Sequence, residues 1–221
     1  MKKGLLIILS GPSGVGKGTV RRKVMEDESL HLAYSISMTT RKPRNQEVDG
    51  VDYFFVSNEE FDRNVEEGNM LEWASFVGNR YGTPKDYVEK LRNEGKNVIL
   101  EIEVEGAKQV MKKCQGSDVF SIFLLPPSME ALEERIRGRK SESEEIIHER
   151  LEKAKREIGL KYQYHYIVLN DDVERASDEI RSIIRSKMNG GGSSVPPPPP
   201  DAAPADNNPF GAPIPEGPLP F

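Results

Sequence analysis

A glycine-rich turn that ends in a lysine follows an apolar run near the start of the chain. The run is Leu5-Leu6-Ile7-Ile8, and the turn reads Gly-Pro-Ser-Gly-Val-Gly-Lys-Gly-Thr at residues 11–19. Glycines allow consecutive backbone N–H groups to point inward, and a following helix adds the positive end of its dipole. The pattern therefore predicts a buried strand over 5–10, a phosphate-binding loop, and a helix over about 17–28.

The residues of this loop that we expect to hold nucleotide phosphates are Gly11, Pro12, Ser13, Gly14, Val15, Gly16, Lys17, Gly18 and Thr19. Lys17 is expected to reach the β- and γ-phosphates as a mobile positive charge. The residue after such a lysine usually offers a hydroxyl to magnesium, but here it is Gly18, and the hydroxyl stands one step later on Thr19. How magnesium would be held stays open between phosphate oxygens, water and Thr19.

The composition of the chain changes near residue 189. Residues 189–221 hold eleven of the sixteen prolines and no lysine or arginine, and they begin with a Gly-Ser run. Such a segment cannot bury enough apolar surface to offset the entropy of ordering it. We expect one folded domain over 1–188 and a disordered tail over 189–221. The tail is either a segment that docks in the aromatic groove of a partner domain or an unstructured, artificially appended linker.

Charge and cysteine content limit the functional class. The net charge is −5, and three acidic residues of the tail account for part of it, so the folded part is nearly neutral. This argues against general nucleic-acid binding. The single cysteine, Cys114, excludes an internal disulfide and fits a reducing compartment. The apolar run after Gly4 is too short for a signal peptide or a membrane span, so we expect a cytoplasmic protein without a membrane partner.

Strand-like and helix-like stretches alternate along the folded part. The predicted strands are 5–10, 34–38, 97–103, 120–125 and 166–170, and predicted helices include 104–113, 129–137 and 173–186. Alternation of this kind predicts an α/β fold with a doubly wound parallel sheet of about five strands and helices on both faces. Residues 52–83 interrupt it with short strands and predict a small, mostly antiparallel subdomain inserted at the edge of the sheet where ligands bind.

Two further groups of residues are candidates for a second site. Arg41 and Arg44 lie three residues apart beside hydroxyl-bearing residues, a pattern that suits bidentate binding of a phosphate but also occurs in ordinary basic loops. Glu72 is either an ion-pair partner or a reader of guanine. Guanine offers adjacent N1–H and N2 amino donors that match a carboxylate, and adenine does not.

Taken together, these motifs resemble the guanylate kinase family from about residue 4 to 187. The residues that carry the resemblance are Gly-Pro-Ser-Gly-Val-Gly-Lys at 11–17, Ser-Met-Thr-Thr-Arg-Lys-Pro-Arg at 37–44, Gly-Val-Asp-Tyr-Phe-Phe-Val at 50–56, Leu-Glu-Trp-Ala at 71–74, Gly-Asn-Arg-Tyr-Gly-Thr at 78–83, Leu-Glu-Ile-Glu-Val-Glu-Gly-Ala at 100–107, Pro-Pro-Ser at 126–128 and Ser-Glu-Ser-Glu-Glu at 141–145. The resemblance implies transfer of the γ-phosphate of ATP to GMP with magnesium, a GMP-binding insert over about 37–84 and a helical lid over about 138–150.

The resemblance also implies roles for single residues. The GMP phosphate would be held by Arg41, Arg44, Tyr53 and Tyr81, and the guanine would be read by Ser37, Glu72, Thr83 and Glu103. Arg139 and Arg150 would close on the transferred phosphate and act in catalysis with Lys17 and Arg41. Asn170 would lie near the adenine of ATP. Glu101 would lie near magnesium, although an acid at the end of a strand is often without such a role.

The sequence departs from the family pattern in the lid and leaves two other functions open. Lys140-Ser141 replaces the more usual Gly-Thr after the lid arginine, and Glu105 replaces a common glutamine. One alternative function is a catalytically inactive guanylate-kinase-like module that binds phosphopeptides through Arg41 and Arg44. The other is a kinase for a different nucleoside monophosphate.

Overall fold

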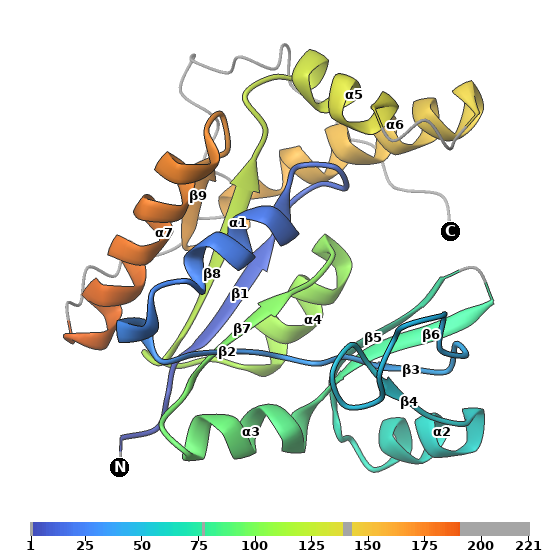
Figure 1. Ribbon diagram of the computed structural model, residues 1–221, viewed down its shortest axis with the longest axis vertical. Coiled ribbons are helices and arrows are strands. Elements are labelled where there is room, and N and C mark those ends of the chain that lie inside the picture. The colour runs from blue at the N-terminus through green and yellow to red at the C-terminus, as the bar shows by residue number, and fades with distance from the viewer. Residues whose placement is uncertain (1, 77, 139–142, 191–221) are drawn as a thin grey trace.

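The core of the molecule is a five-stranded sheet in the order β2-β7-β1-β8-β9 (Figure 1). The computed structural model describes residues 2–76, 78–138 and 143–190. The strands are β1 (Leu6–Ser10), β2 (Leu32–Tyr34), β7 (Asn97–Glu101), β8 (Val119–Leu125) and β9 (Tyr166–Leu169). All four pairings between them are parallel, which confirms the predicted doubly wound fold.

Helices cover both faces of this sheet because its central strands are apolar on both faces. In β1, Leu6 and Ile8 point to one side and Ile7 and Leu9 to the other, and all four are fully buried. The first pair packs in a cluster with residues of α3 (Lys85–Asn93) and α4 (Val104–Lys113), and the second pair packs with α1 (Lys17–Val24) and α7 (Val173–Met188).

Two helices beyond the end of the sheet form a smaller unit. Helix α5 (Met129–Arg137) and helix α6 (Glu144–Gly159) pack through Leu132, Ile136 and Ile147. The hydroxyl oxygens of Ser128 and Ser143 cap the two N-termini by accepting backbone N–H groups. Helix α6 then runs back toward the sheet (Figure 1), and Ile158 near its end belongs to the core cluster that contains Leu6 and Ile8.

A second sheet, in the order β4-β3-β6-β5, forms the insert. Its strands are β3 (Met38–Thr39), β4 (Phe54–Phe55), β5 (Met70–Phe76) and β6 (Asn79–Pro84), with α2 (Asn58–Glu66) packed on it. The β3–β6 and β5–β6 pairings are antiparallel, and the β3–β4 pairing is parallel. The predicted mostly antiparallel insert is therefore confirmed.

The structure corrects three expectations. The predicted strand 34–38 is wrong: Tyr34 ends β2 in the core, Met38 begins β3 in the insert, and the extended chain between them passes from one sheet to the other. The predicted helix 17–28 ends at Val24, and a 3-10 turn over Glu28–Leu30 follows, capped by Asp27. The predicted strand 97–103 ends at Glu101. The expected tail beyond residue 190 lies outside the described residues.

Candidate active site

The turn between β1 and α1 has a backbone that requires glycine. Gly14 and Gly16 have φ angles of 88° and 99°, in the left-handed region that other residues avoid. Gly16 is the N-cap of α1, so the loop leads directly into the N–H groups at the start of that helix. The chain here forms a concave backbone of the kind that binds phosphate groups.

Lys17 bends back over this loop. Its ammonium group donates hydrogen bonds to the carbonyl oxygens of Gly11, at 2.6 Å, and Pro12, at 3.1 Å. Burial lowers the pKa of Lys17, while the nearby carboxylates of Glu103, Glu157 and Glu101 act in the opposite direction. The loop therefore holds a partly desolvated positive charge at its open end.

A cavity of about 310 Å³ opens in front of the loop, lined by Ser13, Gly14, Gly16, Lys17, Gly18, Thr19, Arg22, Glu101 and Glu103. Thr19 is exposed at the start of α1. Glu101 ends β7, and its Oε2 accepts a hydrogen bond from Nε of Arg21 at 2.8 Å. Its Oε1 faces Gly18, where a Cβ atom would approach it to 3.3 Å. A hydroxyl and a carboxylate are oxygen ligands of the kind that Mg²⁺ takes, so both candidates fit that ion.

Side chains from the end of the sheet and from α5 fix the loop from behind. Asn170 is 2% exposed, and its amide nitrogen donates to the carbonyl oxygen of Val15 at 2.7 Å. Arg135 donates to the same oxygen at 3.1 Å and to the Asn170 carbonyl at 3.0 Å. The contact that the structure gives Asn170 is thus with the loop backbone, and its place beside an adenine stays a prediction.

Helix α6 brings further positive charge to the loop. Arg150 donates from Nη2 to the hydroxyl of Ser13 at 2.7 Å. One turn later, Lys153 pairs with Glu103 at 2.9 Å. These contacts hold the middle of α6 against the loop and the cavity. The other predicted lid arginine, Arg139, lies outside the described residues.

The insert gathers the four residues expected to hold an acceptor phosphate. The Arg41 guanidinium lies 5.4 Å from the centroid of the Tyr53 ring, and the rings of Tyr53 and Tyr81 are 6.1 Å apart. Arg41 also forms a two-point ion pair with Glu47, and the same carboxylate accepts the backbone N–H of Arg44 at 2.7 Å. The Glu47 ion pair raises the pKa of Arg41, and burial raises that of Tyr53.

The predicted guanine-reading residues fall into separate places. Glu72 on β5 is 8% exposed, and its Oε1 accepts a hydrogen bond from the hydroxyl of Thr83 at 2.6 Å. Burial raises the pKa of Glu72, although the Thr83 hydroxyl opposes that shift. Ser37 stands half-buried before β3, where its carbonyl oxygen accepts the backbone N–H of Phe54. The structure therefore brings Glu72 and Thr83 into contact.

Glu103 lines the loop cavity instead of touching Glu72. Burial tends to raise the pKa of Glu103, but the positive charges of Lys17 and Lys153 outweigh it and hold the pKa below its ordinary value. Glu103 is the N-cap of α4, and Gly106, in the first turn of that helix, lies against Glu72. The start of α4 thus connects the loop cavity to the buried carboxylate of the insert.

Sequence reasoning missed several residues that take part in these arrangements, among them Arg135, Lys153, Glu47 and Gly106. Glu47 lies six residues after Arg41 and three after Arg44, so an acid in register with a pair of arginines was the available signal. Gly106 was visible only as part of the 100–107 motif. Its packing partner, Glu72, is 34 positions away in the chain, and no local pattern connects them.

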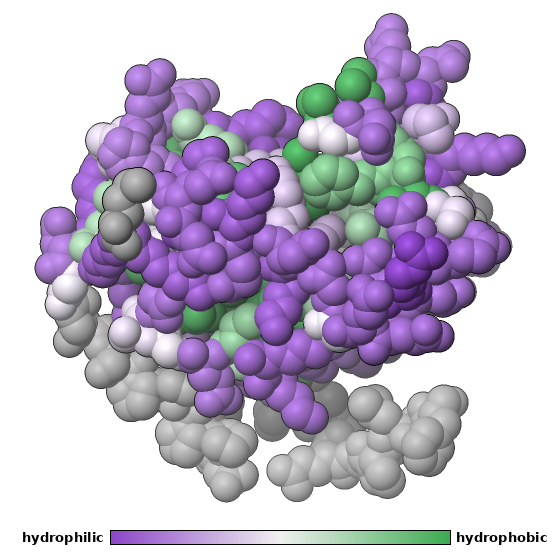
Figure 2. Space-filling model, turned by 90° about the horizontal axis from the view of Figure 1, so that it is seen from below, coloured by the Kyte–Doolittle hydropathy of each residue, from purple (hydrophilic) through white to green (hydrophobic). Residues whose placement is uncertain are grey.

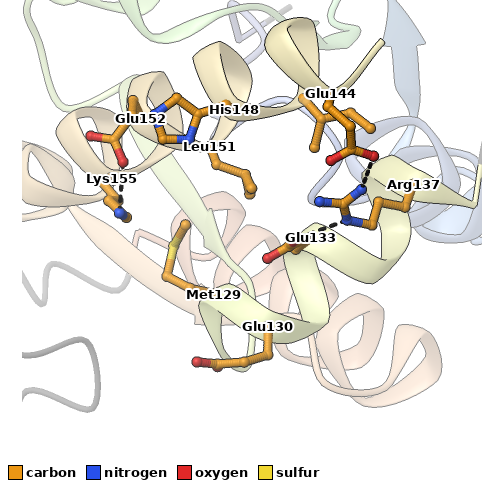
Figure 3. A pocket seen from close by; sticks show the side chains of 10 residues that line it. Met129, Glu130, Glu133, Arg137, Glu144, His148, Leu151, Glu152 and Lys155 are labelled. Carbon is orange, nitrogen blue, oxygen red and sulfur yellow. Dashed lines mark hydrogen bonds and ion pairs between the residues drawn. The ribbon is translucent and has the colours of Figure 1, made fainter. Parts of the chain in front are cut away.

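A second cavity, of about 380 Å³, lies between α5 and α6 (Figure 3). Its floor is apolar, with Met129 and Leu151, and acidic side chains line its rim. Figure 3 shows Arg137 placed between Glu133 and Glu144, to which its guanidinium is bound. This cavity contains none of the predicted site residues.

The surface shows how the apolar residues of the insert are distributed. Seen from below, the molecule is largely hydrophilic, and its most extensive hydrophobic area lies on the side where Figure 1 places the insert (Figure 2). Within the insert, Val48, Val51, Trp73 and Phe76 are exposed. Two of them adjoin Glu47 and Glu72 in the chain. Among the helices of the described residues, none is long and apolar enough to cross a membrane.

Comparison with known proteins adds independent evidence. The sequence profile of the family described as guanylate kinase matches residues 3–187. A guanylate kinase of Bacillus anthracis is 57% identical over 183 residues, which are 83% of this chain and 88% of that protein. The crystal structure of guanylate kinase from Anaplasma phagocytophilum superposes with a TM-score of 0.65 at 35% identity, over 84% of this chain and 87% of that one.

A guanylate kinase of Mycoplasma mycoides subsp. mycoides is 56% identical over 184 residues. That match takes in 83% of this chain and 61% of the relative, so the chain spans less than two thirds of that protein. The profile match extends from the first residues of the core through α7 and includes the loop, the insert and α6. On this evidence the chain belongs to the guanylate kinase family.

Proposed function

We propose that the protein transfers the γ-phosphate of ATP to GMP and gives ADP and GDP. The observation that carries this proposal is the first turn of α4. Glu103 at its start lines the cavity of the phosphate loop, and Gly106, three residues later, lies against the buried carboxylate of Glu72. One short helical turn thus supports a site suited to a triphosphate and a site suited to guanine.

The acceptor phosphate is assigned to Arg41, Arg44, Tyr53 and Tyr81. A guanidinium has two donor edges, and in Arg41 the edge formed by Nη1 and Nη2 is bound to Glu47. The edge formed by Nε and Nη2 has the fork geometry that suits a phosphate. The two tyrosines, stacked edge to face beside Arg41, would add hydroxyl donors.

The base of the acceptor is assigned to Glu72 and Thr83, with Ser37 and Glu103 as further contacts. A carboxylate accepts two hydrogen bonds side by side, which matches N1–H and the N2 amino group of guanine. A buried acceptor is costly when it is left unpaired, so a base without these donors would bind much more weakly.

In this mechanism an oxygen of the GMP phosphate attacks the γ-phosphorus of ATP in line. The new P–O bond forms as the bond to the β-γ bridging oxygen breaks, and ADP leaves with that oxygen. Lys17, Arg150 and Arg139 would stabilise the charge on the transferred group, and no side chain forms a covalent intermediate. The Lys17 ammonium would exchange its two carbonyl partners for phosphate oxygens.

Magnesium and the remaining parts of the chain complete the proposal. Thr19 and Glu101 would hold Mg²⁺ together with phosphate oxygens, and the ion would neutralise charge on the ATP phosphates. Asn170 would support the adenine side of the ATP site. The insert, 37–84, and the lid, 138–150, would close on the substrates and exclude water.

Three assignments concern the chain as a whole. We place the catalytic domain at 1–188 and assign 189–221 to a proline-rich tail, which would either dock in an aromatic groove or remain an unstructured linker. We place the reaction in the cytoplasm, where the single cysteine, Cys114, would remain reduced.

The inactive phosphopeptide-binding module is the competing function. A binding module has no use for a triphosphate loop, yet here the glycines, Lys17 and the Arg150–Ser13 contact are all in place. The function of a fold is decided by its site, and this site includes the parts that a phosphoryl transfer needs.

A coupled assay of ADP release tests the proposal. The full chain is given ATP and magnesium with GMP, AMP, CMP or UMP as acceptor, beside Lys17→Met and Glu72→Gln variants. We expect the wild-type chain to release ADP only when GMP is the acceptor. Lys17→Met should release none, and Glu72→Gln should no longer prefer GMP over the other acceptors. A folded wild-type chain that releases no ADP with any acceptor, but binds a phosphoserine peptide, would overturn the proposal in favour of the binding module.

A further inference from the structure

Helix α4 approaches the insert closely at a glycine. An ideal Cβ atom built on Gly106 would lie 2.7 Å from Oε2 of Glu72 and 3.2 Å from its carboxyl carbon. Both distances are shorter than a van der Waals contact. Gly106 has an ordinary helical backbone. A glycine is therefore needed here because it lacks a side chain, and not because the backbone has an unusual conformation.

The strand that carries Glu72 is fixed to α4 on both sides of this contact. Gln109 accepts the backbone N–H of Trp73 at 3.2 Å and donates to the Trp73 carbonyl at 3.0 Å. Lys113 donates to the carbonyl oxygen of Met70 at 3.0 Å. Since these residues flank Glu72, the strand cannot slide away from α4 without breaking three hydrogen bonds.

The Glu72 side chain is held from its other side as well. Thr83 donates its hydroxyl to Oε1 at 2.6 Å, and the register of β5 against β6 shifts between Met70 and Glu72. An irregularity of this kind turns a side chain toward a direction that a regular strand would not give it. The carboxylate thus lies between the Thr83 hydroxyl and the backbone of α4.

From this geometry we propose that Gly106 is a specificity-determining positioning residue: its lack of a side chain allows Glu72 to lie against the first turn of α4, where the carboxylate is aimed at guanine. This inference rests on the proposed function. Glycine is a poor helix former compared with alanine, so its presence within α4 has a local cost that this contact explains. The raised pKa of Glu72 fits the same tight burial.

The test is Gly106→Ala, with Glu105→Ala as a matched control in the same helical turn. Glu105 is exposed and pairs with Lys108, so its replacement changes the turn without touching Glu72. GMP binding is measured by calorimetry, KM is measured for GMP, IMP and ATP, and Tm is measured for every variant. IMP lacks the N2 amino group, so it reports whether the carboxylate still reads that position.

We expect Gly106→Ala to raise KM for GMP roughly 10- to 100-fold, the range that corresponds to losing hydrogen bonds to a charged group. KM for ATP should stay within about twofold, and the preference for GMP over IMP should fall. Glu105→Ala should match the wild type. In a Glu72→Ala background, Gly106→Ala should cause no further loss of GMP binding, because the clash is gone.

Two binding results would overturn the inference: normal GMP binding by Gly106→Ala, or an equal loss of binding with and without the Glu72 side chain. If Gly106→Ala lowers Tm, Glu72→Ala should restore it, and failure to restore Tm would also contradict a clash between these residues. A wild-type chain that neither binds nor phosphorylates GMP would instead refute the proposed function. The Tm values of the two single variants and the double variant would still show whether a side chain at position 106 clashes with Glu72.

Discussion

The Arg41 guanidinium is bound at both terminal nitrogens by one carboxylate, that of Glu47, at 2.9 Å and 2.8 Å. Both residues lie in the loop before β4, and the same carboxylate accepts the backbone N–H of Arg44. Glu47 therefore fixes the loop that carries both arginines. The Glu47 carboxylate binds Arg41 through Nη1 and Nη2 and leaves Nε without a bond to it, so we interpret the pair as preorganisation for a phosphate.

Replacing Glu47 by glutamine should raise KM for GMP roughly 2- to 10-fold, the factor that corresponds to reordering one long side chain on binding. KM for ATP should not change. Steady-state kinetics with each substrate varied in turn would measure this. Asp62→Asn is the matched control, because Asp62 pairs with Arg80 in the same insert but outside the phosphate cluster. A lower KM for GMP in Glu47→Gln would show that Glu47 competes with the phosphate instead.

Lys17→Met should lower kcat/KM for ATP by at least about 100-fold, as the removal of one electrostatic contact to a transition state does. The stability of the folded protein should not decrease, because burial lowers the pKa of Lys17 and so disfavours its charged form. We expect a Tm equal to or above that of the wild type. Lys112→Met, an exposed lysine at the end of α4, serves as the control for removing a positive charge. Normal turnover in Lys17→Met would exclude the lysine from the reaction.

The parallel core could be predicted from sequence because its signals are local. The run at 120–125 is apolar except for Ser121 and predicts a strand buried on both faces, and the structure buries every residue of β8. Helices α4 and α5 begin and end at the predicted residues, since their periodicity and the Ser128 cap are visible in a short window.

The insert was harder to predict, for a physical reason. An alternating stretch at 34–38 has the period of one strand, but the pattern does not show that the chain leaves one sheet and enters another. Contacts such as Gly106 with Glu72, or Asn170 with Val15, join positions far apart in sequence and depend on how elements pack. The residue types therefore indicated the chemistry of the site, but the contacts of each side chain could be identified only from the folded structure.

Arg150→Met should lower kcat by roughly 100-fold or more, with a smaller effect on KM for GMP. The reason is its position: Nη2 of Arg150 reaches the Ser13 hydroxyl of the loop from α6. Arg156→Met is the control, because Arg156 is exposed on the same helix and has no place in the loop cavity. Single-turnover measurements would separate the chemical step from substrate binding. Equal, small losses in both variants would indicate a general charge effect rather than a role in transfer.

Glu72→Gln and Glu47→Gln should change stability with pH in opposite directions. Burial raises the pKa of Glu72 above its ordinary value of 4.5, so the folded state holds that proton more tightly than the unfolded chain. The stability that the protonated Glu72 side chain contributes is fully present below this ordinary pKa. It is lost as the pH rises through the pKa of the folded state. Glutamine does not titrate, so Tm of Glu72→Gln relative to wild type should increase between pH 5 and pH 8.

The Arg41 ion pair lowers the pKa of Glu47, so its contribution is present above the ordinary value and is lost as the pH falls. Tm of Glu47→Gln relative to wild type should therefore decrease as the pH rises to about 5 and then stay constant between pH 5 and pH 8. Each kcal/mol of difference shifts Tm by about 2–4 °C in a domain of this size, which calorimetry resolves. If the Tm differences of the two variants from wild type changed in the same direction with rising pH, the result would contradict our inference that burial destabilises the charged form of Glu72.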